Sequence, residues 1–136
     1  MTQTGISGAA VSRAADSMLR ALGGTEIRVM FPLLTLPNDP SAQLGLVDPG
    51  VEEVPFSPVV VRILETTSTG PRRRLEFLIS GTNVAEELSS RNLTTGESLF
   101  ASALGVLYQG DLLHIENVTA EYFADAAYLY RVLAVE

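Results

Sequence analysis

The sequence contains no cysteine and no lysine, and its only histidine is His114. Without cysteine the chain can form no disulfide, no thiolate metal site and no cysteine nucleophile. A metal site of ordinary affinity needs two or three histidine or cysteine ligands, so a single histidine predicts none. Because lysine is absent, all nine basic residues are arginines.

Catalytic patterns are also scarce. His114 alternates with Leu113 and Ile115 in an expected strand, so we favour a structural or interface role for it over that of a general base oriented by a carboxylate. No serine lies in a Gly-x-Ser-x-Gly elbow. We therefore predict no catalytic, cofactor-binding or metal-binding residue, and a protein that is not an enzyme.

Long apolar runs are missing as well. None approaches the roughly 20 residues that a helix needs to span a bilayer. The first residues lack the basic segment followed by an apolar one that marks a secretion signal. We expect a protein of the cytoplasm, with no membrane partner.

Charge is sparse and mostly negative. Sixteen acidic residues against nine basic ones give a formal net charge of -7, which argues against tight binding of nucleic acid. Hydrophobic residues make up 46% of the 136 residues and charged ones only 18%, so the chain can bury a hydrophobic core. Its length is that of one domain, and we assign residues 1–136 to a single domain. A small domain with so little charge exposes apolar patches or covers them with partners, which favours oligomerisation.

The first quarter of the chain predicts a helix and a strand. Apolar residues recur every three or four positions from Ser7 to Leu22, and Gly23-Gly24 is a typical helix stop. We therefore assign residues 1–24 to an N-terminal tail and helix, and residues 25–136 to a β-barrel. Thr25 to Phe31 alternates between apolar and polar side chains, which predicts a half-buried strand.

A proline-rich segment follows. Residues 32–58 hold six of the seven prolines, which predicts a long loop without regular structure. It is either a solvated acidic loop or an arm used in assembly. Its acidic residues are Asp39, Asp48, Glu52 and Glu53.

The remainder reads as strands with one short helix. Val59 to Glu65 and Arg73 to Ser80 predict a hairpin, and Ala85 to Arg91 a helix capped by Asn83 with Glu86. Ser98 to Gly105 fits a strand or a short helix equally well. The last strands form a meander: Leu104 to Gln109, Leu112 to Val118, a connection over Thr119 to Asp125, and Ala127 to Val135. The fold class is mainly β: a small antiparallel barrel or sandwich with an N-terminal helix, one short internal helix and a long loop.

Two groups of side chains are candidates for an interface. Arg72, Arg73 and Arg74 form the only basic cluster, and we expect them to pair with an acidic patch on a neighbouring copy, such as its proline-rich loop. Tyr128 and Tyr130 belong to an aromatic-rich C-terminal part and are of a type enriched at interfaces.

The C-terminal residues also carry a resemblance. Gly105 to Val118 comprises a strand, a glycine corner and a second strand ending in Ile115-x-x-Val118, and Tyr128 to Glu136 is a final strand. This order resembles the head-tail connector proteins of tailed bacteriophages, also called stopper, head-closure or head-tail joining proteins. Arg73 to Ile79 resembles the arginine-rich central strand of that family.

The resemblance implies a structural virion protein of the neck or tail, made in the cytoplasm of the host. It would form a ring of about six or twelve copies that joins the portal and adaptor to the tail and gates the DNA channel, with DNA passing without specific binding. A tail terminator, or another tail or baseplate ring protein, would share much of the pattern. An alternative of another class is a small-molecule-binding β-barrel whose pocket is lined by Tyr108, His114 and Tyr128.

Overall fold

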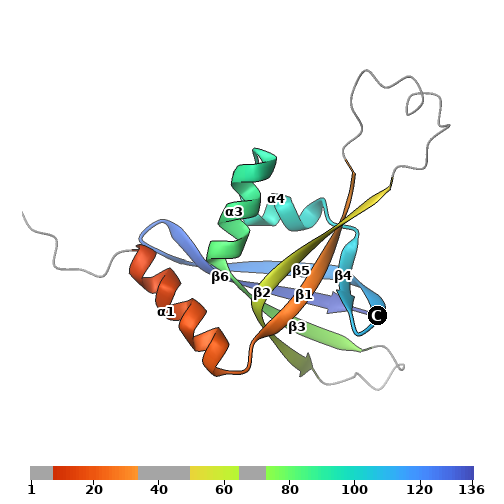
Figure 1. The fold of residues 1–136 in the computed structure, drawn as a ribbon, viewed down its shortest axis with the longest axis horizontal. Coiled ribbons are helices and arrows are strands. Elements are labelled where there is room, and N and C mark those ends of the chain that lie inside the picture. Colours follow the sequence, from red (N-terminus) through yellow and green to blue (C-terminus); the bar gives the residue numbers. More distant parts are fainter. Residues whose placement is uncertain (1–7, 34–49, 65–72) are drawn as a thin grey trace, which may run out of the picture.

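A computed structural model describes residues 8–33, 50–64 and 73–136. Its six strands close an antiparallel barrel in the order β1-β2-β3-β6-β5-β4, which confirms the predicted mainly-β fold with an N-terminal helix (Figure 1). The elements are α1 (Gly8–Ala21), β1 (Thr25–Pro32), β2 (Val51–Leu64), β3 (Arg74–Ser80), α3 (Gly81–Arg91), α4 (Gly96–Ala101), β4 (Gly105–Tyr108), β5 (Asp111–Phe123) and β6 (Ala126–Val135).

The predicted alternation of β1 is confirmed. Ile27, Val29 and Phe31 are at most 2% exposed, whereas Glu26 and Arg28 between them are exposed. Successive side chains of a strand point to opposite faces, so this period of two directs one set into the barrel and the other into solvent. The same rule places Leu75, Phe77 and Ile79 of β3 inside.

Side chains fill the barrel. The phenylalanines Phe31, Phe56, Phe77 and Phe100 are at most 1% exposed, and they come from three strands and from α4. The ring centroids of Phe56 and Phe100 are 6.1 Å apart. Aromatic rings at such distances add to the stabilisation from apolar burial, so the middle of the barrel is a packed core.

The prediction of an irregular loop over residues 32–58 is wrong for its last eight residues. β2 begins at Val51 and pairs with β1 from Pro32↔Val51 to Thr25↔Val59. Pro55 is tolerated because β3 pairs with β2 only from Val59 onward, which leaves one edge of β2 without a neighbouring strand at this point. Glu52 and Glu53 therefore belong to a strand, whereas Asp39 and Asp48 lie outside the described residues.

There are two short helices after β3, where one was expected. α3 begins at Gly81 instead of Ala85, because the Ser80 hydroxyl accepts a hydrogen bond from the Thr82 N–H and caps the helix. The expected cap, Asn83, instead donates its side-chain N–H to the Ser57 carbonyl. α4 makes the first half of the ambiguous Ser98–Gly105 segment, up to Ala101, helical, with Thr95 as its N-cap.

β5 is longer than predicted. The expected connection over Thr119–Asp125 is strand as far as Phe123, and the turn to β6 consists of Ala124 and Asp125 alone. Their φ angles are 50° and 63°, the left-handed conformation that a two-residue hairpin of type I′ requires. The turn over Gln109 and Gly110, also of two residues, uses the same conformation, with φ of 51° and 85°.

Candidate assembly surfaces

The arginine cluster at one end of the barrel is paired within the chain. Arg73 places Nη2 2.7 Å from Asp111 Oδ2 and Nε 2.8 Å from Glu136 Oε2, while Arg74 Nη2 lies 3.0 Å from Glu116 Oε2. The hydrogen bond from Arg73 lowers the pKa of the Glu136 carboxyl, and the same contact raises the pKa of Arg73. These pairs join β3 to β5 and to the C-terminal residue. Arg72 lies outside the described residues.

The acidic residues of β2 are also paired. Glu53 Oε2 accepts from Arg28 Nη1 at 2.8 Å, across the β1–β2 ladder. Glu52 Oε2 accepts from Arg91 Nη2 at 2.8 Å, and Arg91 also contacts Glu87 at 3.3 Å. Both residues that were expected to meet the arginine cluster of a neighbour therefore have arginine partners in their own chain.

The two tyrosine candidates differ. Tyr130 is 4% exposed and packs beside Phe100, with ring centroids 6.1 Å apart. Burial raises the pKa of the Tyr130 phenol to about 12. Its assignment to an interface is corrected to a core role, because Tyr130, Val132 and Ala134 share the inner face of β6. Tyr128 is half-buried at an irregularity of the β5–β6 register, and its interface role stays a prediction.

The three side chains proposed for a ligand pocket are not brought together. His114 is exposed and lines a groove outside the barrel, whereas Tyr108 packs edge-on against Phe77, with centroids 5.6 Å apart, and lines a different hollow beside β1. Tyr128 lines neither. Within the described ranges, no three His, Asp or Glu residues lie close enough together to hold a metal ion.

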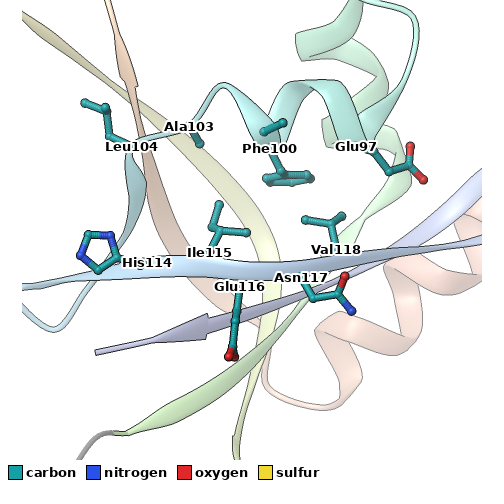
Figure 2. A pocket seen from close by; sticks show the side chains of 10 residues that line it. Glu97, Phe100, Ala103, Leu104, His114, Ile115, Glu116, Asn117 and Val118 are labelled. Atoms are coloured by element: carbon teal, nitrogen blue, oxygen red, sulfur yellow. The ribbon is translucent and has the colours of Figure 1, made fainter.

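A groove of about 430 Å³ runs between α4 and β5, and we call it the α4–β5 groove. Figure 2 shows Ile115 and Val118 pointing from β5 toward Phe100 and Ala103, while Glu116 points away. β4 pairs with β5 only as far as Leu113, so among the described residues this side of β5 has no neighbouring strand along the groove. The lining residues are Glu97, Phe100, Ala101, Ala103, Leu104, His114, Ile115, Glu116, Asn117 and Val118.

The mouth of the groove is apolar at one end and acidic at the other. At one end Leu104, which immediately precedes β4, is 45% exposed. Leu112, on the outer face of β5, is 42% exposed. Glu97 stands at the opposite end (Figure 2) and has no ion pair among the described residues. A partner that fits this surface presents apolar side chains and a cation.

α1 has such a side. Of its apolar residues only Leu19 is buried, while Met18 is 64% exposed and Leu22, just past its end, is 66% exposed. Arg13 and Arg20 are the only arginines of the described chain that form no ion pair. By the 100° rotation per helical residue, the two arginines flank one side of the exposed face and Met18 with Leu22 flank the other. We call these four residues the α1 outer face.

The α1 outer face and the exposed leucines lie apart. In Figure 1, α1 lies at one end of the long axis of the molecule, and β4 lies at the other end together with the start of β5. Leu104 immediately precedes β4, and Leu112 is the second residue of β5. Sequence reasoning found the helix but not the groove, because the groove depends on α4, whose helical state the sequence left open.

No family model, no curated protein and no solved structure matches this chain. No helix in the part of the chain that the structure describes is long and apolar enough to cross a membrane.

Proposed function

We propose that this protein is a structural subunit that assembles into a ring at the head-tail interface of a tailed bacteriophage. One observation carries the proposal: two unlike surfaces with exposed apolar side chains, the α1 outer face with Met18 and Leu22 and the Leu104–Leu112 end of the barrel, lie at opposite ends of one molecule. Contacts between unlike surfaces repeat from copy to copy, and they close into a ring when the rotation between neighbours allows it.

The filled barrel supports a structural role over a binding one. Its centre is occupied by aromatic and aliphatic side chains that are almost wholly buried. A small-molecule barrel keeps its interior free for a ligand. The surfaces left for function are therefore on the outside, where they serve contacts with other proteins.

The phage neck is the setting that the C-terminal strands favour. Ile115 and Val118, which match the connector motif, both lie on β5 and point into the α4–β5 groove (Figure 2). The net charge of -7 suits a ring through which DNA passes without being retained. In this role the ring joins the portal and adaptor on one side to the tail on the other.

Light scattering of the purified full chain over a range of concentrations tests the assembly. We expect a defined oligomer, seen by negative-stain electron microscopy as a ring with a central channel. The variant His114→Ala serves as a control, since a ring subunit needs no catalytic histidine and should assemble unchanged. A protein that stays monomeric at millimolar concentration, or that turns over a substrate through His114, would refute the proposal.

The phage setting has its own test. If the gene lies between genes for a portal and capsid on one side and tail genes on the other, the neck role is supported. A gene among unrelated metabolic genes would count against it.

A further inference from the structure

We propose that the α1 outer face of one copy docks into the α4–β5 groove of the next, and that this contact is the repeating interface of the ring. The inference rests on the proposed function and names the surfaces that assemble. Each surface leaves apolar side chains exposed in the single chain. The barrel does not cover Met18 and Leu22 of the helix, and Leu104 is exposed at the groove.

Charge selects this pairing over a symmetric one. An interface of two α1 outer faces would hold four arginines, Arg13 and Arg20 of each copy, and no Glu97, and an interface of two grooves would hold two Glu97 carboxylates and none of these arginines. Like charges at an interface cost several kcal/mol, whereas opposite charges fix the register. Of these three pairings, the contact of helix with groove is the one that brings arginines with no ion pair among the described residues to a carboxylate that has none there either.

The order of the residues along the helix and along the groove fits this arrangement. From Arg13 to Leu22 the helix rises by about 13 Å, at 1.5 Å per residue. In Figure 2 Glu97 and Leu104 stand at the two ends of the groove, with the apolar side chains of Phe100 and Ala103 between them. Arg13 toward Glu97 therefore puts Met18 and Leu22 toward Leu104. A helix laid into an apolar groove with a charge at its rim is a common mode of protein recognition.

Engineered cysteines test the contact directly, because the natural chain has none. The variant carrying Met18→Cys and Leu104→Cys should form disulfide-linked oligomers under mild oxidation, up to the size of the ring. Each single variant should stay uncrosslinked, because the contact is not symmetric. A control pair, Met18→Cys with Ile63→Cys, should also stay uncrosslinked, since Ile63 is 79% exposed on β2, away from the groove.

Disruption gives a second readout. Met18→Asp buries a charge in the groove, so it should raise the concentration needed for assembly at least a hundredfold, and Ile63→Asp, the matched change at another exposed apolar side chain, should leave assembly unchanged. Circular dichroism should show both variants folded, since both side chains are mostly exposed.

Charge reversal gives a third readout. Arg13→Glu alone, or Glu97→Arg alone, should weaken assembly about tenfold, and the combination of the two should restore it. Glu86→Arg, a reversal on the exposed side of α3, is the control and should have no effect.

The outcomes separate the two proposals. Rings that form without the cysteine 18–104 crosslink, and that are indifferent to Met18→Asp, would overturn the docking inference and leave the ring standing. A natural chain that never assembles would overturn both.

Discussion

Replacing Gly96 with alanine should destabilise the barrel through a single side chain, Tyr130. A Cβ at position 96 would lie 2.2 Å from Tyr130 Cε1 and 2.4 Å from Cζ, far inside van der Waals contact. The ring cannot turn away easily, because it is 4% exposed, packs beside Phe100, and accepts a hydrogen bond from the Gly96 backbone. Overpacking of this kind costs about 1–3 kcal/mol, more than the gain of up to about 1 kcal/mol from removing a helical glycine. We expect Gly96→Ala to lower the free energy of unfolding by about 2 kcal/mol.

A double-mutant cycle with Tyr130→Leu isolates this contact. Leucine lacks the atoms that clash, so Gly96→Ala in that background should cost under about 0.5 kcal/mol, a coupling near 2 kcal/mol. Urea unfolding followed by circular dichroism measures all four variants, compared at equal m-values. Gly8→Ala is the matched control, since Gly8 also begins a helix but its added Cβ would lie 3.2 Å from the Ala126 methyl. Equal costs of Gly96→Ala in both backgrounds would refute the reasoning.

Three further predictions concern the Ala124-Asp125 turn, the buried ring of Tyr130 and the partly buried side chain of Arg91. Ala124→Asn with Asp125→Gly should raise the free energy of unfolding by about 1 kcal/mol, because the present residues hold φ of 50° and 63° and the new pair favours that conformation; an unchanged urea midpoint would contradict this. The pKa of Tyr130 is raised to about 12 in the folded state, so its contribution to stability is complete below pH 10 and falls by up to about 2 kcal/mol between pH 10 and 12. Unfolding at a series of alkaline pH values measures this fall. The variant Tyr130→Phe should lose the part of the fall that comes from Tyr130. Arg91→Ala should lower the free energy of unfolding in urea by about 1–2 kcal/mol, because the Arg91 guanidinium lies 4.2 Å from the Phe31 ring centroid and also pairs with two carboxylates. Arg91→Lys should restore less than half of the lost free energy. Full restoration would show that charge alone matters.

The strands with regular alternation could be predicted almost to the residue. Thr25–Phe31 was expected and Thr25–Pro32 is found, and Arg73–Ser80 was expected and Arg74–Ser80 is found. In each, one face packs on the core, so the buried apolar residues alternate visibly in the sequence, although the polar Ser80 at the end of β3 is buried as well. The expected end of the next helix at Arg91 is also found, because Asn92 follows it with the left-handed φ of 59°.

The misassigned segments depend on their neighbours in space. The start of β2 contains Pro55, which argues against a strand unless one edge is unpaired, and the sequence does not say which edges are paired. The turn at Ala124-Asp125 carries no glycine or asparagine, so the long β5 was cut short at Val118. In both places the tertiary pairing overrides the local preference.

The assembly surfaces were predictable only in kind. Low charge indicated exposed apolar residues, but the helical pattern of α1 treats Met18, Leu19 and Leu22 alike, and only Leu19 is buried. Which apolar side chains stay uncovered is decided by how the helix sits on the barrel, and that depends on contacts such as the hydrogen bond from Ser80 to Asp16. The sequence determines which apolar side chains the helix has, but packing decides which of them stay exposed.

The arginine cluster shows the same selection acting on charge. Arg73 and Arg74 contribute two positive charges at one end of the barrel, and their partners Asp111, Glu116 and Glu136 contribute three negative ones. These five side chains together carry a net charge of -1, so the paired residues themselves offer no surplus of cations to the phosphates of DNA. The cluster instead joins β3 to β5 and to the C-terminal residue, whereas Arg13 and Arg20 of the α1 outer face form no ion pair among the described residues and stay available to a carboxylate of another molecule.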